Sequence, residues 1–392
     1  MGVLDNITVV SLEQAVAAPF ATRQLADLGA RVIKIERPGS GDFARGYDTT
    51  VKGLSSYFVW LNRSKESITL DLKRPGGREI LDRLLAKADV FVQNVAPGAS
   101  DRLGTSPADL RARLPKLIVC SVSGYGTSGP FADRKAYDLL VQSEAGLVSV
   151  TGTKEDPAKA GISVADIAAG MYAYSGILAA LLARASHGRG TTVEVSLFDA
   201  LGEWMSAPAY YTMYGGRAPE RSGPYHASIA PYGPVRTRGG RTLLLGVQND
   251  AEWQRLCADV LQLPDLARDD QFATNPKRVA NRTALDDAIA RVTSQLTADE
   301  LVTRLDAARI AHAGMSSMAD FVAHPQLAAR GRWRDVESPA GPLRALAPPV
   351  QLDDLEPVMG PVPALGAHTD AILSELNFSR DQIADWRREG TI

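Results

Sequence analysis

The stretch from Ile7 to Glu36, ITVVSLEQAVAAPFATRQLADLGARVIKIE, decides the fold. Residues 7–12 and 31–36 are rich in β-branched apolar residues, which is typical of buried strands. Residues 17–28 between them have the apolar spacing of a helix, and Gly29 follows at the position where a left-handed residue commonly ends one. Two strands joined by a helix form a βαβ unit, so this stretch predicts a parallel sheet.

The same alternation continues through the first half of the chain. Further extended segments are expected at residues 67–72, 90–94, 117–123 and 191–196, with helices at 76–87 and after Asp166. Strands that alternate with helices in this way indicate an α/β fold with a doubly wound parallel sheet.

From about Gly202 the composition changes. The segments 210–219 and 222–232 are rich in Gly, Pro, Tyr and Ser, which predicts a connection to a second, smaller domain. In that domain and the tail we expect a strand at 242–247, helices at 251–261, 279–296 and 297–308, and a final helix at 370–376.

Composition restricts the class of function. Lys and Arg total 43 and Asp and Glu total 45, so the net charge is −2, which argues against binding to nucleic acid or a membrane surface. Cys120 and Cys257 form no CxxC pair, and the five histidines form no HxH or HExxH pattern, so we expect no disulfide, no metal site and a cytoplasmic location. The start lacks the features of a signal peptide. The apolar helix near 171–185 is expected to be a buried core helix.

The segment Gly124–Gly129 matches the dinucleotide pattern GxGxxG. Pro130 follows directly, no apolar helix opens there, and no acidic residue ends a strand about 20 residues later. The sequence therefore disfavours a dinucleotide site.

Cations stand after several predicted strands. Arg37 lies in the segment 34–42 past the second strand, where it suits a phosphate contact or an ordinary polar turn. Lys73, Arg102 and Lys135 follow later strands in the same manner. Because ligands bind outside the carboxyl ends of parallel strands, these cations either converge on a polyphosphate or form a solvated face.

Asp166 precedes a long apolar helix, and position alone favours a helix cap. The same position suits a nucleophile, because a helix start stabilises an ionised carboxylate. Ala168, Ala169 and Gly170 are small, so we expect them to leave room for a bulky acyl group beside Asp166.

Taken in order, these motifs resemble the class III CoA-transferases, the family of formyl-CoA transferase and carnitine CoA-transferase. The resemblance covers nearly the whole chain: residues 17–20, 25–30, 34–42, 67–73, 94–98, 124–130, 137–138, 161–176, 188–190 and 365–369.

The resemblance implies a large doubly wound domain built from both chain ends, a smaller α+β domain, and an interlocked homodimer. On this basis we expect a large α/β CoA-binding domain over 1–200, a linker over 201–225, the small domain over 226–330, and a return to the large domain over 331–392.

The resemblance also implies roles for individual residues. Asp166 is the expected nucleophile. CoA contacts are expected at Arg37, Leu70, Lys73, Asn94, Val95, Arg102, Lys135, Tyr137 and Asp138. Substrate contacts are expected at Val16, Ala17, His226, Ser228 and Tyr232. Val16 stands where formyl-CoA transferase has Gln, and His226–Tyr232 replaces its glycine-rich flap, so this region looks more like the succinate–glutarate type.

The implied reaction transfers CoA from an acyl-CoA such as succinyl-CoA to a carboxylic acid, with a CoA thioester as substrate and no prosthetic group. A dicarboxylate such as mesaconate, itaconate, citramalate or glutarate fits, with Arg45, Arg217 or Arg221 on its distal carboxylate. Three alternatives stay open: intramolecular transfer on mesaconyl-CoA, acyl-CoA binding without catalysis, and α-methylacyl-CoA racemisation. The racemases have His at the position of Tyr137, and a tyrosine pKa of about 10 makes a poor base.

Overall fold

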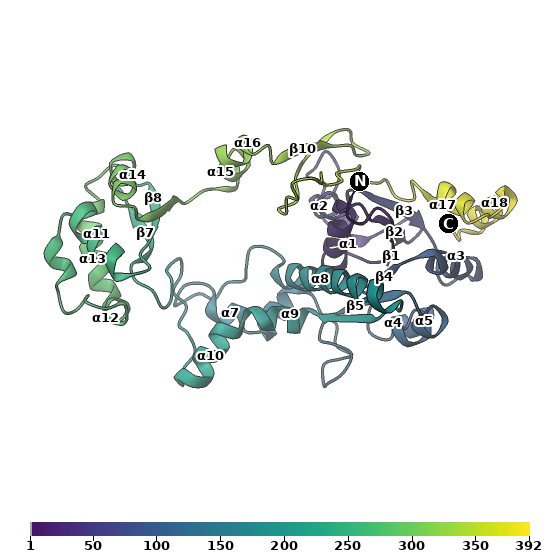
Figure 1. Ribbon diagram of the computed structural model, residues 1–392, viewed down its shortest axis with the longest axis horizontal. Coiled ribbons are helices and arrows are strands. Elements are labelled where there is room, and N and C mark those ends of the chain that lie inside the picture. Colours follow the sequence, from purple (N-terminus) through teal and green to yellow (C-terminus); the bar gives the residue numbers. More distant parts are fainter. Residues whose placement is uncertain (1) are drawn as a thin grey trace. The chain divides into compact units, whose positions relative to one another are not determined.

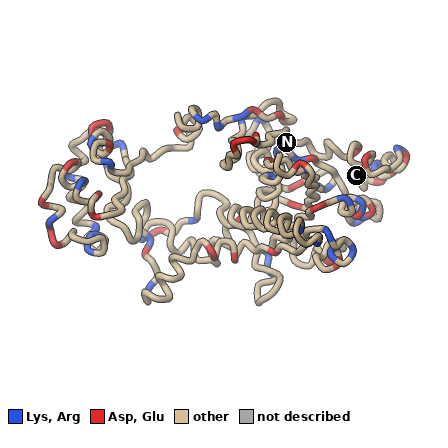
Figure 2. The backbone as a smooth tube through the Cα atoms, viewed as in Figure 1, with Lys and Arg blue, Asp and Glu red and all other residues tan. Residues whose placement is uncertain are grey.

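The computed structural model describes residues 2–392, which form two compact units. Unit 1 contains the chain up to residue 145 together with 160–206 and 326–392. Unit 2 contains 146–159 and 207–325. Basic and acidic residues are interspersed along both units (Figure 2), in keeping with the net charge of −2.

Unit 1 is built on a six-stranded parallel sheet, which confirms the predicted α/β class. The strand order is β3-β2-β1-β4-β5-β6. The strands are β1 (Thr8–Leu12), β2 (Arg31–Glu36), β3 (Lys65–Thr69), β4 (Val90–Gln93), β5 (Ile118–Ser123) and β6 (Thr192–Ser196). The order reverses between β1 and β4, so the loops after these two strands lie at the topological switch point, where doubly wound sheets bind ligands.

Helices cover this sheet and connect its strands. Those placed within unit 1 are α1 (Ala17–Asp27), α2 (Ser56–Asn62), α3 (Pro75–Lys87), α4 (Ala99–Leu103), α5 (Pro107–Arg113), α6 (Asp138–Glu144), α8 (Val164–His187), α9 (Leu197–Trp204), α17 (Thr369–Glu375) and α18 (Arg380–Glu389). A short 3-10 turn, Phe43–Gly46, and the hairpin β10 (Trp333–Val336) and β11 (Leu343–Leu346) complete it. The extended segment expected at 67–72 begins earlier, at Lys65, because a buried ion pair allows a lysine to begin a buried strand.

The C-terminal segment closes the β3 edge of the sheet. The His368 amide donates to the Ser67 carbonyl at 3.0 Å, and the Asp71 amide donates to the Thr391 carbonyl at 2.7 Å. Leu373 and Phe378 join the buried cluster that includes Phe91 of β4. Figure 1 shows α17 and α18 beside α3. The sequence predicted only the first of these two helices.

Helix α8 packs along α1 through a close contact at Gly170. A Cβ atom placed on Gly170 would lie 2.7 Å from the Ala17 carbonyl oxygen and 2.9 Å from the Phe20 ring. Among residues 2–392, α8 alone is long and apolar enough to cross a membrane by length and composition. It is longer than the expected 171–185. It packs on α1, α9, β5 and β6, but Met171, Tyr172 and Leu182 are 38, 38 and 74% exposed, so the helix is only partly buried.

We expect Gly170→Ala to destabilise unit 1 by about 1–3 kcal/mol, because the added methyl group forces α1 and α8 apart. Urea denaturation measures this change. The matched control is Gly202→Ala in α9, where an added Cβ meets nothing within 4 Å and is expected to stabilise the helix by about 0.5–1 kcal/mol. Equal stability of the two variants would contradict the close packing.

Unit 2 contains an antiparallel sheet in the order β7 (Tyr232–Arg236), β8 (Thr242–Gly246) and β9 (Ala311–Gly314). Its longer helices are α10 (Ser206–Gly215), α13 (Arg282–Thr293) and α14 (Ala298–Ala307). The shorter ones are α7 (Leu147–Val150), α11 (Asp250–Arg255), α12 (Asn275–Ala280) and α15 (Met318–Val322), and α16 (Pro325–Ala329) leads back to unit 1. The single helix expected at 279–296 is interrupted at Asn281, and the expected linker 201–225 contains α10.

Candidate active site

Asp166 lies in the first turn of α8 and does not cap it. The helix begins at Val164 after Ser163, whose side chain makes no capping bond. The cap comes from another helix instead: Oδ1 of Asp138 accepts from the Ala165 amide at 2.8 Å and from the Asp166 amide at 3.3 Å. Expecting Asp166 to act as the helix cap was therefore wrong. Within residues 2–392 no donor binds its carboxylate, which leaves the group available.

The small residues that follow Asp166 do not open space for a ligand. Ala168 and Ala169 are fully buried, and Gly170 is in contact with α1. The expectation of acyl space at these positions is wrong, because helix packing uses them.

The N-terminus of α1 lies beside Asp166. Gly170 meets Ala17 and Phe20, and Gln24 contacts Met171 at 3.4 Å, so α1 and α8 run side by side in the same direction. Asp166 is one turn before Gly170 on the same face of α8, which places it at the level of the start of α1. No side chain caps α1, so its first amides remain available to a ligand beside Asp166, whereas the first amides of α8 bind Asp138.

Tyr47 is a neighbour of Asp166 that the sequence did not identify. Partial burial, followed by the charges of Asp42 and Asp166, raises the pKa of Tyr47 to about 12. Its ring packs edge-on against Tyr57 with centroids 5.6 Å apart. Tyr137 and Tyr57 also act on Tyr47, so three phenols and two carboxylates share this region. The only signal in the sequence is that Tyr47 follows the 34–42 segment.

Burial and the nearby charge of Asp138 raise the pKa of Asp166 to about 7. A helix start favours the ionised carboxylate, but here desolvation and the like charge outweigh it. Near pH 7 the protonated and ionised forms of the Asp166 carboxyl are therefore both populated.

Most charged side chains of the segment 34–42 are buried, namely those of Lys34, Glu36 and Asp42. Lys34 is fully buried and lies 2.7 Å from Asp42 and 3.4 Å from Glu13, and Glu13 lies 2.7 Å from Lys65. Burial alone would lower the pKa of Lys34, but Glu13 and Asp42 outweigh it and the net shift is upward. Arg37, in contrast, is exposed beyond β2.

The other predicted CoA contacts divide into two groups. Arg37, Lys73, Arg102 and Lys135 are exposed and follow β2, β3, β4 and β5, whose carboxyl ends share one edge of the sheet. Leu70 is 2% exposed and its side chain belongs to the core, so only its backbone can meet a ligand.

Asn94 and Val16 lie at the switch point. The Asn94 side chain accepts from the Gln14 amide and donates to the Gln14 carbonyl, both at 2.9 Å. Val95 beside it is half-buried. Val16 and Ala17 are 4% and 2% exposed at the start of α1, so they offer backbone groups more than side chains.

The segment His226–Tyr232 is a closed turn within unit 2. The His226 and Tyr232 rings stack with centroids 5.2 Å apart, and the Ser228 amide donates to Nδ1 of His226 at 3.2 Å. Arg282 donates to the carbonyls of His226 and Ile229 at 2.6 and 2.9 Å. The backbone is therefore fixed from α13, while the side chains of His226 and Ser228 are exposed.

Two of the arginines expected to hold a distal carboxylate bind protein groups instead. Arg45 forms a two-bond ion pair with Glu36 at 2.7 and 2.8 Å. Arg221 donates to the carbonyls of Thr153 and Lys154 at 2.7 and 2.8 Å. Arg217 remains exposed in unit 2.

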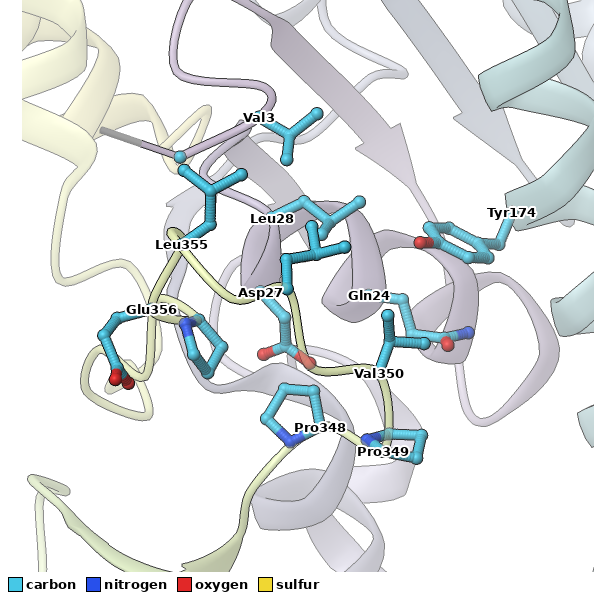
Figure 3. A pocket seen from close by; sticks show the side chains of 13 residues that line it. Val3, Gln24, Asp27, Leu28, Tyr174, Pro348, Pro349, Val350, Leu355 and Glu356 are labelled. Atoms are coloured by element: carbon cyan, nitrogen blue, oxygen red, sulfur yellow. The ribbon is translucent and has the colours of Figure 1, made fainter.

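A pocket in unit 1 lies against the C-terminal half of α1 (Figure 3). Asp27, Leu28, Tyr174 and the prolines 348–349 are among its 13 lining residues, and Asp166 is not. Asp27 is already paired with Arg23 and Arg63. Within residues 2–392 no group of His, Cys, Asp and Glu has the arrangement of a metal site.

Comparison with known proteins identifies the type of chain. A model of "CoA-transferase family III" matches residues 4–369. An acyl-CoA transferase of Fusarium pseudograminearum is 36% identical, with 100% of this chain and 88% of that protein aligned. A succinate–glutarate CoA-transferase of Agrobacterium fabrum is 35% identical over 95% of each chain. The crystal structure of a CAIB/BAIF family protein from Brucella suis superimposes with a TM-score of 0.84 at 35% identity, covering 96% of this chain and 99% of that one.

Proposed function

The chain belongs to CoA-transferase family III, and from this premise we propose that it moves CoA from succinyl-CoA or a similar donor to a dicarboxylic acid, with Asp166 as nucleophile. The observation that supports this role is the free Asp166 carboxylate beside two helix starts. The substrate class follows from the relative in Agrobacterium fabrum, whose name specifies succinate and glutarate.

The first half of the reaction transfers CoA to the enzyme. The ionised Asp166 attacks the thioester carbonyl, the C–S bond breaks, and a mixed anhydride forms as CoA leaves as a thiolate. The thiolate then attacks the aspartyl carbonyl and expels the donor acid as its carboxylate. The product is a thioester between Asp166 and CoA.

The second half reverses this sequence with a new acid. The acceptor carboxylate attacks the aspartyl carbonyl, and CoA again leaves as a thiolate. A second anhydride forms, and the thiolate attacks its acceptor carbonyl to release the new acyl-CoA and the free Asp166 carboxylate. Each tetrahedral step develops negative charge on a carbonyl oxygen, which backbone amides at a helix start stabilise.

Chemical trapping tests the nucleophile directly. The protein is incubated with succinyl-CoA and then with hydroxylamine or borohydride, and its peptides are analysed by mass spectrometry. We expect the modification at Asp166 and none at Asp138. A label on another residue, or no label while exchange proceeds, would rule out this mechanism. A CoA-transfer screen of succinyl-CoA and acetyl-CoA against mesaconate, itaconate, citramalate and glutarate then identifies the acceptor.

The pKa of Asp166 predicts a pH dependence. Because only the ionised carboxylate attacks, kcat/KM is expected to rise with pH and level off above about 7. In Asp138→Asn the amide oxygen still accepts from the Ala165 amide, but the like charge is removed, so the acid limb moves down by about one pH unit. The profile is measured from pH 5 to 9, with Asp133→Asn as an exposed control. An unmoved acid limb in Asp138→Asn would refute the coupling.

The CoA substrate is proposed to bind along the sheet edge in unit 1. The exposed cations Arg37, Lys73, Arg102 and Lys135 are suited to its phosphates, because their strands end on one side. Val95, Tyr137 and Asp138 complete the proposed CoA site, whereas the Asn94 side chain binds the Gln14 backbone. His226, Ser228 and Tyr232 of unit 2 are proposed to contact the substrate.

We also propose that the protein is an interlocked homodimer in the cytoplasm. All ten residues of α10 are described and none is buried, and Tyr210, Met213 and Tyr214 are 59, 62 and 83% exposed. An apolar surface of this kind needs a partner. Light scattering is expected to give twice the mass of 41.9 kDa, and a monomer would overturn this assembly. Cys120 and Cys257 are free and buried, which suits a reducing compartment.

A further inference from the structure

The loop that joins β1 to α1 is held in a strained conformation. Ala15 has a φ of +62°, in the left-handed region that favours glycine. Strain at a residue other than glycine persists only where the surroundings enforce it, and such residues concentrate at functional sites. This loop leads directly into the start of α1 beside Asp166.

Two side chains enforce this conformation from opposite sides of the switch point. Asp42, beyond β2, accepts from the Ala15 amide at 3.0 and 3.2 Å through its two oxygens. Asn94, beyond β4, binds both the amide and the carbonyl of Gln14 at 2.9 Å. Two consecutive loop residues, Gln14 and Ala15, are therefore held by side chains that follow β2 and β4, the two strands that flank β1.

Asp42 is itself fixed by buried groups. It is 1% exposed, it accepts from Lys34 at 2.7 Å and from the Ala44 amide at 2.9 Å, and its own amide donates to Glu36 at 2.9 Å. A carboxylate with all these partners cannot rotate away from the Ala15 amide without leaving a buried charge unpaired.

We infer that Asp42 and Asn94 are positioning residues, which hold the Gln14–Ala15 loop so that the uncapped amides at the start of α1 stay beside Asp166. This inference rests on the proposed role of Asp166. The amides then face the oxygen on which charge develops, where a displacement of about 1 Å costs roughly 100-fold in rate. The role assigned to Asn94 acts on the chemical step and differs from direct contact with CoA.

Asn94→Ala and Ala15→Gly test this role, because Asp42 also holds the buried lysine and its substitution would first test the fold. Asn94→Ala removes both bonds to Gln14. Ala15→Gly relieves the left-handed strain, so the loop gains other conformations while the fold keeps its contacts. The matched control is Asn281→Ala, which removes an asparagine that binds two backbone carbonyls in unit 2, those of Gln271 and Lys277.

The rate of Asp166 labelling at saturating succinyl-CoA and the Kd for CoA are measured separately for each variant. We expect Asn94→Ala to slow labelling and kcat by roughly 10–100-fold and Ala15→Gly by roughly 3–10-fold. Complete loss of one oxyanion donor lowers kcat by about 10²–10³-fold, and a misplaced donor should cost less than that. The Kd for CoA should change less than about 3-fold, and Asn281→Ala should change neither quantity.

Two results would overturn the inference. A weakened CoA affinity in Asn94→Ala with an unchanged labelling rate would make Asn94 a direct CoA contact. Unchanged labelling and kcat in both variants would make the loop contacts purely structural. If the wild type carries no label at Asp166, the proposed nucleophile fails, and the steady-state kcat values of the variants still decide the positioning role.

Discussion

Asp166→Ala is expected to lower kcat for CoA transfer by roughly 10⁴-fold or more, because the covalent intermediates have no other carboxylate on which to form. The charge of Asp138 acts on Asp166, but the Asp138 oxygens already bind the amides of α8 and the Gln142 side chain. Exchange of label between succinyl-CoA and succinate measures the loss. The exposed control Asp133→Asn should retain activity, and a loss below about 10-fold in Asp166→Ala would reject the nucleophile.

Removing the charge of Asp166 by substitution with asparagine is expected to stabilise the folded protein. The carboxyl pKa rises from 3.8 to about 7 on folding, so the folded state favours the protonated form. The cost of ionisation is absent below about pH 4 and complete above about pH 7. We expect Asp166→Asn to raise the free energy of unfolding by about 2 kcal/mol at pH 8, after allowance for partial exposure, and to have little effect at pH 4. A destabilised variant at pH 8 would contradict this sign.

Glu13→Ala is expected to destabilise unit 1 by about 3–5 kcal/mol, because it leaves the buried Lys65 without its ion-pair partner, while Lys34 keeps Asp42. Glu13 is 1% exposed and accepts from Lys65 and Thr22, both at 2.7 Å, and from Lys34 at 3.4 Å. Lys65 would retain only the Pro19 carbonyl and the Asn62 amide oxygen as acceptors.

Urea denaturation at pH 7 measures the loss, and an exposed ion pair supplies the control. Glu79 lies 2.7 Å from Arg83 on the outer face of α3, and both side chains are more than 40% exposed. Glu79→Ala is expected to change stability by less than about 0.5 kcal/mol. Similar effects of the two substitutions would indicate that burial does not set the strength of the Glu13 cluster.

The strands were predictable because their side chains carry a periodic or continuous apolar signal. Residues 8–12, 31–36 and 90–93 form strands within one or two residues of the expected ranges. β3 was misplaced because its first residue, Lys65, is charged yet fully buried, and only the distant Glu13 explains that burial. Helix α18 was missed because its face is mostly polar, although Ser379 and Gln382 form a capping box.

The site was predictable in its central residue and less so in its surroundings. Asp166 could be selected by its motif, but the group that caps its helix is 28 residues away at Asp138, and no local pattern reveals that contact. Arg45 and Arg221 appeared available for a ligand because a sequence does not show which cations already bind protein groups. Tyr47 was missed for the converse reason, since an isolated tyrosine in a turn carries no pattern.

The C-terminal cover of the sheet has a consequence for synthesis on the ribosome. All six strands of the parallel sheet lie within the first 196 residues, yet its β3 edge is completed only by residues 366–391. During elongation β3 therefore emerges as an open edge, and the apolar surface later covered by Leu373 and Phe378 stays exposed to water while residues 197–365 are synthesised. A nascent chain of this type is a natural client for chaperones, and premature termination anywhere before residue 366 would yield an aggregation-prone fragment rather than a smaller folded protein.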